Sequence, residues 1–120
     1  MDKDNVLERV FVYGTLKKGH SNDVYLKDSV FVGEGAINKG YGLYVFGLPF
    51  LVKDDKGLGC YGEIYLVSKE TLNDLDVLEG HPSIYKRELL DIIELDTGHK
   101  LKCWCYIYQG RTGEDYVRRF

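Results

Sequence analysis

The chain has 120 residues, a formal net charge of −3 and a pI near 5.6, and 44% of its residues are hydrophobic. This length suits one domain, residues 1–120, with enough apolar side chains for a folded core. The basic residues are scattered, which argues against a nucleic-acid-binding surface. No run approaches the ~18 apolar residues of a membrane span, and the polar N-terminus lacks a signal-peptide core. We therefore expect a cytoplasmic protein with no nucleic-acid or membrane partner.

The clearest strand signal lies near the start of the chain. Residues 10–13 are all β-branched or aromatic, which is typical of a strand buried on both faces. The run breaks at Gly14, where the missing Cβ lets the backbone approach a ligand, and the N–H groups that follow can form a concave nest for a carboxylate or phosphate. Alternatively, Gly14 and Gly19 are only the corners of a tight connection. A phosphate loop is the weakest interpretation, because the G-x-x-x-x-G-K-[ST] pattern is missing.

Further strands are predicted along the rest of the chain. In chain order they are residues 29–37, 41–46, 49–52, 58–67, 85–95 and 101–108. Turn residues at 38–40 predict that the first of these reverses into the second, those at 54–57 predict a hairpin, and those at 96–98 join the last two strands. The dense glycines between residues 33 and 47 predict bulges or bends. Residues 109–120 are polar and receive no assignment.

Two helices are expected. A short one spans residues 21–29, where Ser21-Asn22-Asp23 can cap it. The other begins after Ser68, a good N-cap, and ends at Gly80, with Pro82 just beyond. Its apolar residues recur at helical spacing and predict a buried stripe. They are Leu72, Leu75, Val77 and Leu78.

The three cysteines are Cys60, Cys103 and Cys105, and they lack the C-x-x-C spacing of zinc or redox sites. In a strand, Cys103 and Cys105 point to the same face, which favours packing as small apolar side chains. The alternative is a metal site that combines this pair with a histidine. The candidates for that ligand are His20, His81 and His99. Because the ligand spacing is missing, we predict no metal.

Glu79 is an unusual residue in the predicted helix. It lies in the last turn, where the partial negative charge of the carbonyl end disfavours a carboxylate by about 0.3–1 kcal/mol. A partly buried position would raise its pKa further, towards the range in which it can exchange protons near neutral pH. Alternatively, Glu79 points into water at the helix end.

The ordered set of motifs resembles the gamma-glutamylcyclotransferase-like family, and is closest to its gamma-glutamylamine cyclotransferase branch. The motifs are, in chain order, the run from Val10 to Gly19, the segment Gly62-Glu63-Ile64-Tyr65, and the run from Leu75 to Arg87. Their order and spacing fit over about residues 8–108. Each motif alone is moderately specific, whereas the ordered set is much more so.

The resemblance implies an α+β fold, a small mixed β-barrel of about six or seven strands with one or two helices packed outside. It implies Glu79 as the catalytic acid/base, and a substrate-binding set for the γ-glutamyl group. That set is Tyr13, Gly14, Thr15 and Leu16. In the implied reaction the substrate's α-amine attacks its own γ-carbonyl and 5-oxoproline and an amine are released. The implied partner is a small γ-glutamyl compound, no cofactor is needed, and a monomer is favoured.

The chemistry of this reaction suits one carboxylate that lies between two nitrogens, because it can take a proton from the attacking amine and return one to the leaving amine. The amides of residues 14–16 would grip the substrate's α-carboxylate or stabilise the oxyanion, and the sequence leaves both open. The alternative function is a non-catalytic module that binds γ-glutamyl or other carboxylate ligands. Tyr85, Arg87 and Tyr108 are secondary candidates without an assigned role.

Overall fold

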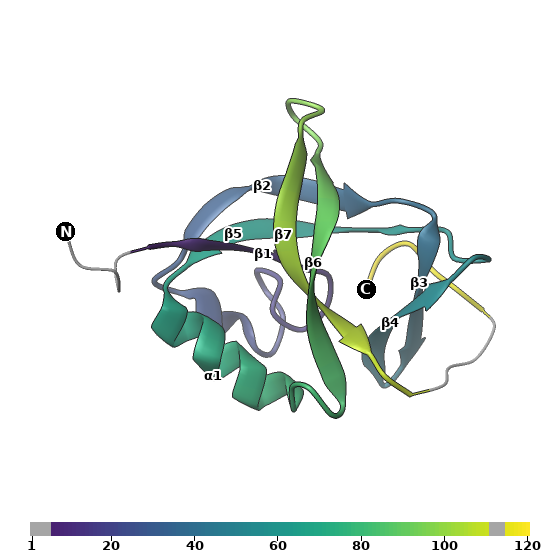
Figure 1. Ribbon diagram of the computed structural model, residues 1–120, viewed down its shortest axis with the longest axis horizontal. Coiled ribbons are helices and arrows are strands. Elements are labelled where there is room, and N and C mark those ends of the chain that lie inside the picture. Colours follow the sequence, from purple (N-terminus) through teal and green to yellow (C-terminus); the bar gives the residue numbers. More distant parts are fainter. Residues whose placement is uncertain (1–5, 111–114) are drawn as a thin grey trace.

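The computed structural model describes residues 6–110 and 115–120. Its elements are β1 (Glu8–Val12), the 3-10 turn η2 (Asp23–Leu26), β2 (Val30–Ile37), β3 (Gly40–Phe46), β4 (Leu48–Asp54), β5 (Cys60–Val67), α1 (Lys69–Glu79), β6 (Tyr85–Glu94) and β7 (Lys100–Tyr108). Five strands close a barrel in the order β1-β5-β2-β6-β7, and β3 and β4 form a separate two-stranded sheet at one end (Figure 1). The polar N-terminal residues 1–5 and part of the tail, residues 111–114, lie outside the described residues.

The barrel is mixed because β1 pairs antiparallel with β5 and parallel with β7. This confirms the expected α+β barrel, although five of the seven described strands close it. The expected reversal of β2 into β3 and the hairpin of β4 with β5 are wrong. Instead β2 pairs with β5, and Ile37 lies opposite Cys60 at one end of this pairing. The chain between these two residues leaves the barrel and forms β3 and β4. Gly57 returns the chain past β3 so closely that an added Cβ would lie 2.2 Å from the Tyr41 backbone.

Strand β1 separates two hydrophobic clusters, which explains why its residues 10–12 are apolar on both faces. Phe11 belongs to a cluster in the barrel interior, whereas Val10 and Val12 belong to a cluster between the barrel and α1. All three side chains are nearly inaccessible to solvent. The prediction of a strand buried on both faces is therefore confirmed.

The three cysteines pack in the barrel interior. Cys60, Cys103 and Cys105 are fully buried members of the interior cluster, and Cys103 and Cys105 point to the same face of β7, as predicted. Burial raises the pKa of the Cys60 thiol to about 12 and that of Cys103 to about 11. These thiols therefore stay protonated near neutral pH and act as small apolar groups.

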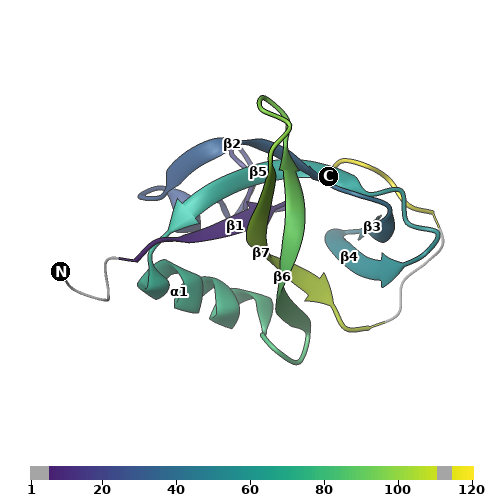
Figure 2. The ribbon, with the colours of Figure 1, turned by 45° about the horizontal axis from the view of Figure 1, so that its top comes forward.

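Helix α1 lies along the outside of the barrel (Figure 2). The Ser68 hydroxyl accepts a hydrogen bond from the N–H of Thr71 at 3.1 Å, and Gly80 ends the helix in the left-handed conformation with φ of 65°. Both ends are as predicted. Leu72 and Leu75 are buried, but Val77 is 83% exposed, so its assignment to the apolar stripe is wrong. At 100° per residue, Val77 lies on the opposite side of the helix from Leu75.

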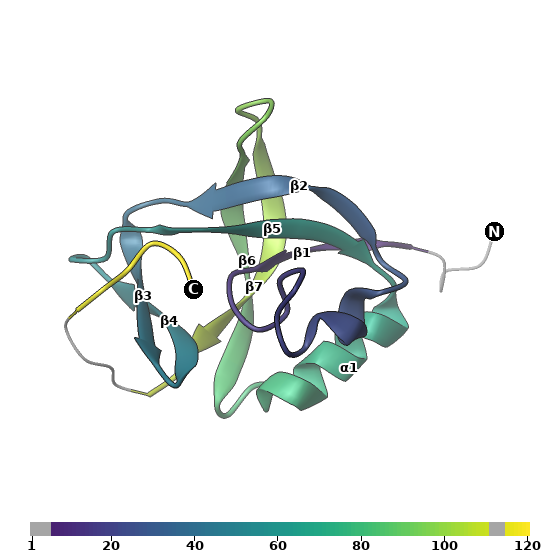
Figure 3. The same ribbon diagram turned by 180° about the vertical axis from the view of Figure 1, so that it is seen from behind.

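The segment between β1 and β2 folds beside α1 (Figure 3), and its only regular element is η2. The glycine-rich strand β2 contains a register shift between Phe31 and Gly33, which confirms a predicted bulge. In the tail, the N–H of Val117 donates to the carbonyl of Leu43 at 2.8 Å, and Phe120 packs against the interior cluster. No helix within residues 6–110 and 115–120 has the length and apolar character to cross a membrane.

Candidate active site

The first part of the site is the turn that follows β1. The carbonyl of Gly14 accepts a hydrogen bond from the N–H of Lys17 at 3.0 Å, which puts Thr15 and Leu16 at the centre of a β-turn. A Cβ at Gly14 would lie 2.2 Å from Cγ of Pro49, closer than any real contact. Gly14 is therefore needed for the close approach of Pro49, which joins this turn to β4.

Asn22 holds the turn in place. Its backbone N–H donates to the Thr15 carbonyl at 2.9 Å, and its side-chain Nδ2 donates to the Thr15 hydroxyl at 3.0 Å. The N–H groups of Thr15 and Leu16 have no acceptor within residues 6–110 and 115–120. Two neighbouring amides with no partner in the described part of the chain can donate to an anionic ligand.

The second part of the site is Glu79 at the end of α1. This end of the helix is clamped to the barrel through Asp76, whose carboxylate accepts from the Tyr106 hydroxyl at 2.7 Å. The guanidinium of Arg87 lies 2.9 Å from the same carboxylate and 4.3 Å above the ring of Trp104. One helical turn beyond Asp76, Glu79 is thereby directed inwards.

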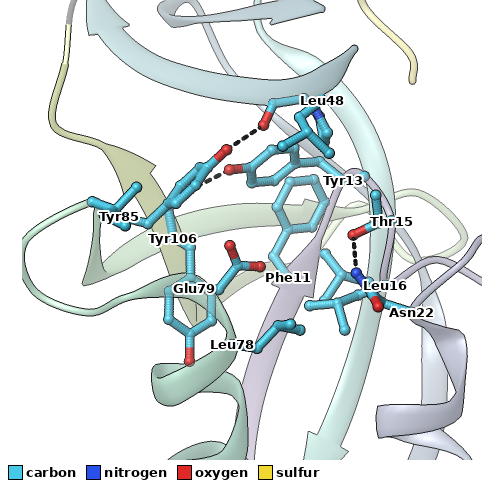
Figure 4. A pocket seen from close by; sticks show the side chains of 14 residues that line it. Phe11, Tyr13, Thr15, Leu16, Asn22, Leu48, Leu78, Glu79, Tyr85 and Tyr106 are labelled. Carbon is cyan, nitrogen blue, oxygen red and sulfur yellow. Dashed lines mark hydrogen bonds between the residues drawn. The ribbon is translucent and has the colours of Figure 1, made fainter.

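A cavity of about 300 Å³ lies between the turn and the helix end. Its lining residues are Phe11, Val12, Tyr13, Gly14, Thr15, Leu16, Asn22, Leu48, Pro49, Leu78, Glu79, Ile84, Tyr85 and Tyr106. Figure 4 shows the carboxyl group of Glu79 directed into this space, with Thr15 and Leu16 across the cavity. The structure thus brings together all five residues expected at the site, although Glu79 lies more than sixty positions after the other four in the sequence.

Most polar groups that line the cavity are already paired with the protein. The hydroxyl of Tyr13 donates to the Tyr106 carbonyl at 2.6 Å, and that of Tyr85 donates to the Pro49 carbonyl at 2.7 Å. Glu79 has no hydrogen bond or ion pair with any of the described residues. Its carboxyl group is therefore the ionisable group of the lining that is free to act on a ligand.

Burial raises the pKa of Glu79 from 4.5 to about 7. Near neutral pH the side chain is thus present in both protonation states, as an acid/base catalyst requires. Burial also raises the pKa of Tyr85 and that of Tyr13, with the charge of Glu79 as the next cause for Tyr85 and a smaller one for Tyr13, so these hydroxyls remain protonated donors. The rise for Glu79 agrees with the expectation for a partly buried position, whereas the predicted contribution of the helix end is not among its causes.

The secondary candidates have different positions. Tyr85 lines the cavity, whereas Arg87 binds Asp76 outside it and Tyr108 packs against Phe50 at 4.7 Å between ring centroids. Sequence reasoning missed Tyr106, which bonds to both parts of the site. Because side chains alternate along a strand, the sequence indicates that Tyr106 faces away from Cys103 and Cys105. It does not indicate that α1 covers this face.

The raised pKa of Glu79 predicts a pH-dependent effect on stability. The folded chain keeps a proton that the unfolded chain releases between about pH 4.5 and 7, so the stabilising contribution of protonated Glu79 is present below pH 4.5 and lost as the pH rises through 7. In Glu79→Gln no carboxyl group titrates, so this decrease in folding stability with rising pH is absent. Each pKa unit corresponds to about 1.4 kcal/mol, which screening by solvent at the partly exposed side chain reduces.

We therefore expect the free energy of unfolding of Glu79→Gln, relative to wild type, to increase by about 1–2 kcal/mol between about pH 5 and pH 8. Denaturant unfolding at both pH values measures this difference. Asp74→Asn is the matched control, because Asp74 is exposed on the same helix and does not line the cavity. A difference that stays constant with pH would contradict a buried, titrating Glu79.

Comparison with known proteins identifies the class. The family described as "Gamma-glutamyl cyclotransferase, AIG2-like" matches residues 10–119. A putative gamma-glutamylcyclotransferase of Methanocaldococcus jannaschii is 43% identical over 108 residues, which cover 89% of each chain. The gamma-glutamylaminecyclotransferase of Rattus norvegicus is 33% identical over 115 residues, with 83% of this chain and 77% of the relative covered.

A solved structure agrees with these matches. The crystal structure of an AIG2-like protein from Mus musculus has a TM-score of 0.85 and 31% identity, and the match covers 95% of this chain and 88% of the mouse chain. The chain belongs to the gamma-glutamyl cyclotransferase, AIG2-like family. The names of the family and of these relatives support a gamma-glutamylcyclotransferase, acting on a small molecule, as the class of enzyme.

Proposed function

We propose that the protein is a cyclotransferase that releases 5-oxoproline and a free amine from a small γ-glutamyl compound, with Glu79 as the general acid and base. One observation carries the proposal: Glu79, Thr15 and Leu16 line one cavity. Among the described residues, the Glu79 carboxyl group has no partner and the N–H groups of Thr15 and Leu16 have no acceptor. A γ-glutamyl group offers a carboxylate for the amides and an amine for the carboxyl group.

The first step is proton removal from the substrate's α-ammonium group by the Glu79 carboxylate. With its pKa raised to about 7, Glu79 is a stronger base than an ordinary carboxylate, which lowers the free-energy cost of taking a proton from the α-ammonium group. The freed amine then attacks the γ-carbonyl carbon. The cavity contributes by holding the substrate folded, with nitrogen and carbon about 3–3.5 Å apart.

The second step is loss of the attached amine as the carbon–nitrogen bond breaks. An alkylamine has a pKa of about 10.4, so it must receive a proton as it departs. Protonated Glu79 supplies this proton, then takes the second proton from the ring nitrogen and passes it to the released amine, which leaves as an ammonium ion. Overall, two protons of the α-ammonium group end on the released amine and the Glu79 carboxylate is restored. The free amides of the turn serve the α-carboxylate or the oxyanion.

The substrate class is tested by incubating the purified protein with γ-glutamyl-ε-lysine, γ-glutamyl-alanine and glutathione, and quantifying 5-oxoproline from each. We expect release from at least one of them, and highest for a γ-glutamyl amine such as γ-glutamyl-ε-lysine. Thermal stabilisation by 5-oxoproline without turnover of any compound would instead favour a binding module for γ-glutamyl ligands. No release and no stabilisation would contradict both functions.

A further inference from the structure

A charged side chain is buried next to the candidate site. Lys17 is 9% exposed, and it is the single buried charged side chain within residues 6–110 and 115–120. It directly follows Thr15 and Leu16, and its backbone N–H closes their turn on the carbonyl of Gly14. Lys17 does not line the cavity, so any effect that it has on a ligand must pass through this turn.

The side chain of Lys17 is bound to the tail of the chain. Its Nζ donates to the main-chain oxygen of Phe120 at 2.9 Å, across 103 positions of the sequence. The ring centroid of Phe120 lies 5.2 Å from that of His20, whose backbone N–H donates to the Lys17 carbonyl at 3.0 Å. Figure 3 shows the end of the tail beside the segment that follows β1.

The tail can hold Lys17 because it is itself fixed to the barrel. The carbonyl of Arg118 accepts from the N–H of Tyr61 in β5 at 2.8 Å, and the guanidinium of Arg119 lies 4.4 Å above the ring of Tyr61. Phe120 packs against the interior cluster. Residues 117–120 therefore form a strap that connects the barrel to the turn.

We propose that Lys17 and Phe120 are positioning residues for the cyclotransferase reaction: the strap holds the turn so that the amides of Thr15 and Leu16 face the ligand. The inference rests on the proposed function and adds to it two residues that lie outside the cavity. A buried hydrogen bond from a charged donor changes a local equilibrium by about 10–100-fold. Without this bond the turn loses its connection to the strap, and the two amides are held less firmly at the cavity.

Amide hydrogen exchange of the folded protein tests the connection without a ligand. Lys17→Met keeps an unbranched side chain of similar length and removes the donor. The N–H groups of residues 17, 20 and 22 hydrogen-bond within the turn segment, and we expect them to exchange about 10–100-fold faster in this variant. The amides of β5 and β7 should change far less. Lys18→Met is the matched control, because Lys18 is exposed on the same turn and does not line the cavity.

Two results of this experiment would overturn the proposal. Equal exchange of the turn amides in Lys17→Met and Lys18→Met would show that the strap does not hold the turn. A uniform rise that includes β5 and β7 would show that Lys17 contributes only to global stability.

The affinity for 5-oxoproline tests whether the strap also positions the amides for a ligand. This product carries a carboxylate and the former γ-carbonyl oxygen, so it reports on the amides whichever of the two groups they serve. We expect its dissociation constant to rise about tenfold or more in Lys17→Met and to stay unchanged in Lys18→Met. The kcat/KM for 5-oxoproline release should fall by a similar factor, with its pH midpoint unchanged, because Glu79 lies across the cavity.

The variant Phe120→Ala provides a second, independent test. It should weaken 5-oxoproline binding as Lys17→Met does, and the double variant should be no worse than the poorer single variant, because each change breaks the same connection. Additive losses, or unchanged affinity despite faster exchange of the turn, would overturn the positioning role. If wild-type protein released no 5-oxoproline from any γ-glutamyl compound, the cyclotransferase function would be contradicted, whereas hydrogen exchange would still decide whether the strap holds the turn.

Discussion

Replacing Glu79 with glutamine is expected to reduce the rate of 5-oxoproline release by a factor of about 10²–10⁴, the usual contribution of a positioned acid/base. Glutamine has nearly the same shape as glutamate but cannot exchange a proton at neutral pH. Binding through the amides of Thr15 and Leu16 is unaffected by this change. The loss is therefore expected in kcat, with KM changed far less.

The same variant distinguishes catalysis from folding. Glu79 has no protein partner among the described residues, so its replacement breaks no contact that holds α1 to the barrel. Circular dichroism and thermal melting should be close to wild type at acid pH, and Asp74→Asn should retain full activity. Activity of Glu79→Gln within a few-fold of wild type would show that another group transfers the protons.

Helix α1 is the element that the sequence predicts best, because its signals are local. The Ser68 cap and the Gly80 end depend on backbone geometry within one turn, and the structure has both. The prediction that Val77 belongs to the buried stripe is wrong, because four apolar residues in seven positions do not define a single face of a helix. The direction of Glu79, one turn beyond Asp76, depends on contacts that no local pattern contains.

The distribution of strands between barrel and outer sheet could not be predicted from local signals. Turn residues at 38–40 and 54–57 correctly indicate where β2 and β4 end, but not which strands pair with each other. Strand β5 pairs with β2 and β1, so its partners are selected by burial of the interior cluster. The excursion that carries β3 and β4 is what supplies Leu48 and Pro49 to the cavity.

Asn22 illustrates a local signal with two competing outcomes. Asparagine before a helix predicts a side-chain cap, yet Asn22 makes no cap at η2 and bonds to Thr15 instead. Gly14 also has two possible interpretations in the sequence. A glycine that breaks a strand permits the close approach of a ligand, or it is a simple corner. In the structure, it is Pro49 that lies against Gly14.

Tyr106 connects the two parts of the site. Its carbonyl accepts from Tyr13, next to the turn, and its hydroxyl donates to Asp76 in the helix that carries Glu79. Both bonds are buried or partly buried, where solvent competes weakly. One residue of β7 thus connects the turn of Thr15 and Leu16 to the helix end that carries Glu79. Under the proposed mechanism, this connection holds the two parts in position for proton transfer.

Gly14→Ala is expected to lower kcat/KM by about 10–100-fold and the free energy of unfolding by about 1–3 kcal/mol. The new Cβ would lie 2.2 Å from Cγ of Pro49, and a proline ring cannot rotate away. Either the turn that carries Thr15 and Leu16 or strand β4 must move. Because a displacement of about 1 Å at a reacting group costs about 10²-fold, the free-energy effect on activity is comparable with that on stability.

A second substitution separates this clash from any other effect of alanine. Pro49→Ala removes the Cγ atom, so the double variant should recover a substantial part of the activity lost in Gly14→Ala, measured against Pro49→Ala alone. The recovery is incomplete, because Cβ of residue 49 still lies 3.0 Å from the new methyl group. Equal losses in the presence and absence of Pro49 would mean that residue 14 acts through the backbone or the ligand, and that the contact with β4 does not position the turn.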